Sequence, residues 1–125
     1  MNESDTLQKA ISQFRRAAIS KGAEGGETDH QLYDQIADAY HQMLAAGKNG
    51  IDALQALAND SDPNVQSWAE SQSLYDGDRT MLVVLERLAQ RDDMIGFNAS
   101  MVLREHKNGT LGSPLPKLPG RTNRG

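Results

Sequence analysis

The chain of 125 residues contains no cysteine, which excludes a disulfide framework, a thiolate metal site and a cysteine nucleophile. It has no apolar run of about 18 residues and no basic start followed by an apolar stretch and a cleavage site. We therefore expect neither a membrane span nor export, and a cytoplasmic location. No segment has the pattern of a strand or of a glycine-rich phosphate-binding loop.

Charge is unevenly distributed along the chain, although the net charge is only −4. Residues 22–105 hold 15 of the 17 acidic residues and five basic ones, a balance of −10, whereas residues 1–21 carry +2 and residues 106–125 carry +4. An acidic body repels phosphate backbones, which disfavours nucleic acid as a ligand. It favours a basic protein partner. The alternative is that the acidic charge serves only to keep the protein soluble.

Apolar residues recur at spacings of three and four in six segments, which predicts six helices and an all-α fold. The helix-start signals are Thr28 with Gln31, Asn49, Asp62 with Pro63, Asp78, and Asp92 or Asp93. Asn108 and Gly109 end the last predicted helix. A glycine-rich connection is expected within residues 21–27.

One pattern occurs twice, about 30 residues apart, which indicates stacked helical pairs. Each copy has spaced leucines, a polar turn, and then two small apolar residues four apart. The first copy comprises Leu54, Leu57, the turn 60–63, Val65 and Ala69, and the second comprises Leu85, Leu88, the turn 91–93, Ile95 and Ala99.

The first copy resembles a HEAT-like repeat, whose second helix opens with aspartate and proline, then a valine, then an alanine four residues later. Gln66 stands where that pattern has arginine, and Asp93 replaces the proline in the second copy. Over residues 5–111 the chain is also similar to a bacterial family catalogued as domain of unknown function 2019. Segments 60–69, 79–89 and 99–104, with Asn108 and Gly109, carry that similarity. The resemblance implies an α-α superhelix and no assigned activity.

The predicted organisation is a HEAT-like helical domain over residues 1–109, with about six helices in a right-handed stack, and a disordered basic tail over residues 110–125. The tail contains three of the four prolines and lacks helical periodicity. A docking peptide in extended conformation over residues 114–119 is the alternative.

The candidate partner-binding residues gather at the repeat turns and the adjoining helix starts: Asp60, Asp62, Trp68, Glu70, Asp92 and Asp93. The paired aspartates also suit helix capping, which would explain them without a partner. The single tryptophan suits either packing in the core, against Phe97 in the last helix, or a partly exposed anchor for a partner.

Three classes of function fit these observations. The favoured one is a non-catalytic protein-protein interaction module with an acidic surface, and its specific version is an immunity or antitoxin-like protein that masks a basic partner. A self-associating structural protein is the second, pairing through Leu7, Ile11 and Phe14. The third is a metal- or small-ligand-dependent enzyme that uses Asp34, Asp38 and His41, which share one helix face.

That face also carries Gln31, Gln35 and Gln42, so a solvated polar surface explains it equally well. We therefore expect no metal, no cofactor and no enzymatic activity.

Overall fold

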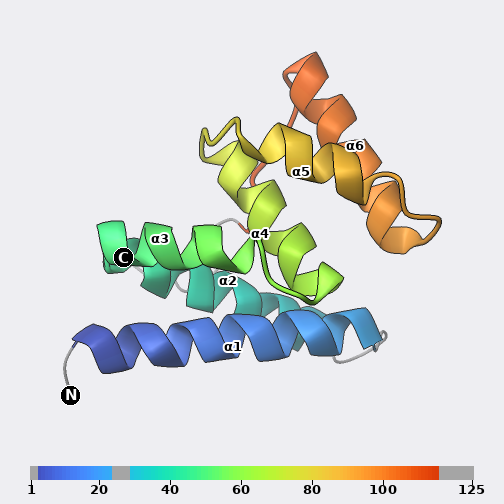
Figure 1. Cartoon of the computed structure of the whole chain (residues 1–125). Coiled ribbons are helices and arrows are strands. Elements are labelled where there is room, and N and C mark those ends of the chain that lie inside the picture. Colours follow the sequence, from blue (N-terminus) through green and yellow to red (C-terminus); the bar gives the residue numbers. More distant parts are fainter. Residues whose placement is uncertain (1–2, 24–28, 116–125) are drawn as a thin grey trace. The chain divides into compact units, whose positions relative to one another are not determined.

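The computed structural model describes residues 3–23 and 29–115 (Figure 1). These residues form six helices and no strand, which confirms the all-α prediction. The helices are α1 (Glu3–Ala23), α2 (Asp29–Ala45), α3 (Lys48–Leu57), α4 (Pro63–Tyr75), α5 (Met81–Leu88) and α6 (Met94–Asn108). None of them is both long enough and apolar enough to cross a membrane. The right-handed superhelix stays a prediction.

The chain forms two compact units, the first over residues 1–56 and 115–125 and the second over residues 57–114. In the first unit α1 packs along α2. The buried side chains there are mostly small: Ala10, Phe14, Ala17 and Ala18 from α1, with Ile36, Ala37, Ala39, Tyr40 and Met43 from α2. The side-chain amide of Gln13 also donates a hydrogen bond of 2.8 Å to the carbonyl oxygen of Gln35. Because alanines let two helices approach closely, this pair needs few large side chains to exclude water.

A tight turn joins α2 to α3. Gly47 adopts a φ of 70°, which favours glycine. A Cβ on Gly50 would overlap the carbonyl oxygen of Met43. Helix α3 begins at Lys48, so Asn49 lies inside the helix, and the prediction that it is the N-cap is wrong. The predicted start at Thr28 and most of the glycine-rich connection lie outside the described residues.

In the second unit α4, α5 and α6 each pack against the other two. The core consists of Leu57, Ala58, Val65, Ala69, Leu74, Met81, Leu85, Leu88 and Ala99. Gly109, with a φ of 75°, caps the end of helix α6 after Asn108, as the sequence predicts. Helix α5 differs from its prediction, because Asp78 does not cap it: Thr80 precedes the helix, and the Asp78 carboxylate accepts hydrogen bonds from the backbone N–H and the hydroxyl of Thr80.

Residues 116–125 of the predicted tail lie outside the described residues. The described part contains Leu115, which groups with the first unit and is fully buried. Just before it, the Ser113 hydroxyl donates to the side-chain oxygen of Gln72 over 3.4 Å, within the second unit. The boundary at residue 110 stays a prediction.

Candidate functional site

Two acidic turns lie at one edge of the second unit. Helices α4 and α6 pack together and both begin at this edge, with α5 running the opposite way between them (Figure 1). The turns before α4 and α6, residues 58–62 and 89–93, contain four acidic residues and one basic residue. These two turns hold Asp60, Asp62, Asp92 and Asp93, which we call the acidic edge.

Asp62 has a structural role within this edge. Its side chain caps α4, with Oδ1 accepting hydrogen bonds from the backbone N–H groups of Asn64 at 2.8 Å and Val65 at 3.3 Å. Pro63 takes the first helical position, where its missing N–H costs nothing. The Asp60 carboxylate accepts from the backbone N–H of Asp62 at 2.9 Å, which fixes the turn. Both side chains are half-buried.

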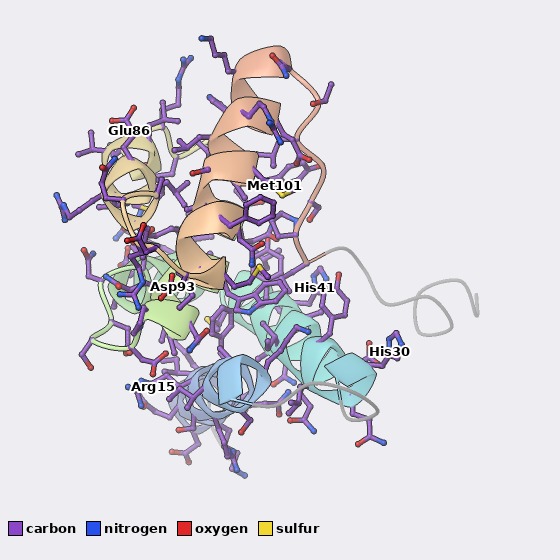
Figure 2. All side chains as sticks on the ribbon, turned by 90° about the vertical axis from the view of Figure 1, so that its right-hand side faces the viewer. Arg15, His30, His41, Glu86, Asp93 and Met101 are labelled. Carbon is purple, nitrogen blue, oxygen red and sulfur yellow. The ribbon has the colours of Figure 1, made fainter. Side chains whose placement is uncertain are left out.

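Asp93 caps α6 in the same way, and Figure 2 shows it at the start of that helix. Its Oδ1 accepts from the backbone N–H of Gly96 at 3.1 Å, and its Oδ2 lies 2.7 Å from Nη2 of Arg91. The side-chain hydrogen bond from Arg91, assisted by the backbone of Gly96, lowers the pKa of Asp93. Asp92 is exposed beside them. The edge thus carries four carboxylates and a single guanidinium group.

Glu70 does not belong to the exposed surface that the sequence predicts. Its side chain is 1% exposed, and its Oε1 has no hydrogen-bond partner among the described residues. Burial raises its pKa to about 7, with the charge of Arg87 acting in the opposite direction. Ser71, Gln72 and Ser73 are buried as well. The second half of α4 is therefore an interior segment, and a partner at the surface cannot reach Glu70.

Trp68 is half-buried, so this observation does not decide between packing in the core and a partly exposed anchor for a partner. Phe97, its expected packing partner, is 58% exposed. Phe97 therefore lies largely outside the core. Trp68 lies in the second turn of α4, one turn away from the acidic edge.

Two exposed apolar residues at the beginning of α6 were not predicted from the sequence. Met94 is 67% exposed and Phe97 is 58% exposed. The helical spacing of the apolar residues indicates their exposure, because the inward face of this helix is already filled by the buried Ala99 and the half-buried Ile95 and Val102. On a helical wheel Met94 and Phe97 fall on the opposite side.

Asp34, Asp38 and His41 do not form a metal site. Within residues 3–23 and 29–115 no three such side chains come close enough together to hold an ion. The side-chain amide of Gln42 instead donates to Oδ2 of Asp38 at 2.9 Å. The His41 ring lies 5.0 Å from the Tyr40 ring, and His41 and His30 both project from α2 (Figure 2). In the described part of α2 these three side chains are therefore not arranged as a set of metal ligands.

The stripe of α1 that could pair with a second copy is largely used inside the first unit. Phe14 is fully buried, and Leu7 and Ile11 are half-buried, while α1 packs along α2. This packing leaves little of the stripe for self-association.

In comparisons with known proteins, no family model, curated protein or solved structure matches the chain. The resemblance to HEAT-like repeats and to the bacterial family stays a prediction on the segments that carry it.

Proposed function

We propose that this chain is a non-catalytic interaction module that binds a basic protein partner through the acidic edge. In this proposal the protein acts in the cytoplasm, and its helical pairs stack as in HEAT-like repeats. The observation that supports the proposal is that the turns before α4 and α6, two helices that pack together, carry Asp60, Asp62, Asp92 and Asp93 with one arginine, Arg91. The two turns are about 30 residues apart in the sequence, and the helices that follow them pack on each other.

The carboxylates of this edge are held in place before any partner arrives. Asp60, Asp62 and Asp93 each accept at least one backbone hydrogen bond, so binding costs little further side-chain entropy. The lowered pKa of Asp93 keeps that group ionised. A fixed array of one charge sign steers an oppositely charged partner and raises its association rate.

A specific version of this function is masking, as an immunity or antitoxin protein does for a basic toxin. The chain is small and its central part is acidic. A protein of this kind needs only a complementary surface, because covering the basic site of its partner is sufficient to inhibit it.

A triple variant tests the proposal without disturbing the fold. Asp60→Asn, Asp62→Asn and Asp92→Asn together remove three charges, while asparagine keeps the side-chain oxygen that accepts the backbone hydrogen bonds. Glu86→Gln is the matched control, because Glu86 is exposed on α5 and lies away from Asp93 (Figure 2). Each tagged variant is used to capture partners from its native host at low salt, followed by elution with rising salt.

We expect the wild-type chain and the Glu86→Gln variant to retain one basic protein in stoichiometric amount, and the triple variant to lose it. Recovery of the same partner by the triple variant would contradict a role for the acidic edge. Recovery of untagged copies of the chain alone would favour self-association.

A further inference from the structure

Met94 and Phe97 form an apolar patch at the surface of the second unit. They lie one turn apart on the same side of α6, and their side chains are 67% and 58% exposed. Met101 continues the same side one turn further along and is half-buried (Figure 2). Two large apolar side chains exposed in contact range on one helix are typical of binding surfaces, and methionine adapts to the shape of its partner.

This patch begins where the acidic edge ends. Met94 follows Asp93 directly, so the first turn of α6 presents apolar side chains next to the carboxylates of Asp92 and Asp93. At the other end of the same side lie Arg104, which is exposed, and Glu105, which is half-buried. Along this side of α6 the surface therefore carries negative charge first, then apolar side chains, and at its far end one charge of each sign.

The charges select the occupant of this patch. A second copy of the chain paired antiparallel on α6 by two-fold symmetry would set only Arg104, with Glu105 beside it, against the acidic edge. A cluster of lysines or arginines would neutralise more of that charge. A segment with lysine or arginine at one end and apolar side chains in its next turns matches the surface, because its basic end meets the acidic edge while its apolar side covers Met94 and Phe97.

We propose that Met94 and Phe97 are the apolar anchor of a docking site for a basic amphipathic segment of the partner protein, oriented with its basic end at the acidic edge. This inference rests on the proposed function and adds to it the position, the chemistry and the direction of the bound segment. The apolar pair supplies affinity through burial, and the acidic edge supplies the steering and the orientation.

Two labelled synthetic peptides of equal charge test the site with the full chain. The first carries a lysine cluster followed by leucines at helical spacing, and the second is an oligolysine. Binding is measured by fluorescence anisotropy with the wild-type chain, with Met94→Gln/Phe97→Gln, and with the matched control Val83→Gln. Val83 is 61% exposed on α5, so the control replaces an equally exposed apolar side chain elsewhere on the unit.

We expect the leucine-containing peptide to bind the wild-type chain and the Val83→Gln variant about tenfold more tightly than oligolysine, which corresponds to about 1.4 kcal/mol. The double variant should bind both peptides equally. Equal binding of both peptides by the wild-type chain, abolished by the triple aspartate variant, would overturn the apolar anchor and leave the proposed function standing. Failure of both peptides to bind the wild-type chain would contradict the anchor and the acidic edge together.

Discussion

Gly96 lies so close to the backbone of Arg91 that a Cβ at residue 96 would overlap the Arg91 carbonyl oxygen. This approach closes the turn between α5 and α6, and it places the Asp93 cap and the Arg91 ion pair at the acidic edge. Glycine inside a helix ordinarily costs about 1 kcal/mol relative to alanine. Here the absence of a side chain is what allows the turn.

We therefore expect Gly96→Ala to destabilise the chain by about 1 to 3 kcal/mol, opposite in sign to the helix propensity of alanine. Urea unfolding followed by circular dichroism measures the change. Gly112→Ala is the matched control, because a Cβ there meets nothing within 4 Å, and its free energy of unfolding should stay within about 0.5 kcal/mol of wild type. Stabilisation by Gly96→Ala would show that the turn relaxes freely.

Capping of α4 by Asp62 predicts a difference between two substitutions at one position. Asp62→Ala removes the acceptor for the N–H groups of Asn64 and Val65 and should cost about 1 kcal/mol of unfolding free energy. Asp62→Asn keeps an acceptor oxygen and should cost much less. Equal losses in urea unfolding would mean that the charge of Asp62, rather than its cap, stabilises the helix.

Burial of Glu70 predicts that stability depends on pH. Its pKa is about 7 in the folded chain, above the ordinary value of 4.5 that applies after unfolding. Between these values the folded chain holds more protons than the unfolded chain, so the free energy of unfolding falls as pH rises from about 4.5 to about 7 and then levels off. The fall should be on the order of 3 kcal/mol.

Glu70→Gln identifies the source of that dependence. The neutral amide keeps the shape of the side chain and removes its titration, so the variant should be more stable than wild type at pH 8 and should lack the decline between pH 5 and 7. The Glu86→Gln variant, altered at an exposed glutamate, should keep the wild-type profile. An unchanged decline in Glu70→Gln would assign the pH dependence to another group.

The sequence predicted best those features that depend on neighbouring residues. Asp62 with Pro63, Asp93 and Gly109 each act within a few residues of their own position, and each ends or begins its helix as expected. Asn49 and Asp78 show the limit of this reasoning. Gly47 allows α3 to begin at Lys48, and Asp78 uses its carboxylate to hold the turn at Thr80.

Features that depend on contacts between residues distant in the sequence were harder to predict. Glu70 lies in a polar run with Ser71, Gln72 and Ser73, which ordinarily indicates a surface, yet the run is buried by tertiary packing. Phe97 is the converse case, since packing against Trp68 in the core was one of two alternatives for it and its side chain is largely exposed. The acidic edge was predicted as a set of turns, and its assembly depends on α4 and α6 packing together.

The most direct test of the acidic edge is the association rate of the captured partner as a function of salt, measured by stopped-flow fluorescence for the wild-type chain and for the Asp60→Asn/Asp62→Asn/Asp92→Asn variant. We expect the wild-type rate constant to fall about tenfold or more between low and high salt, because screening removes the steering field. The variant should associate slowly at low salt and respond much less. Equal rate constants for the two proteins at every salt concentration would contradict the account.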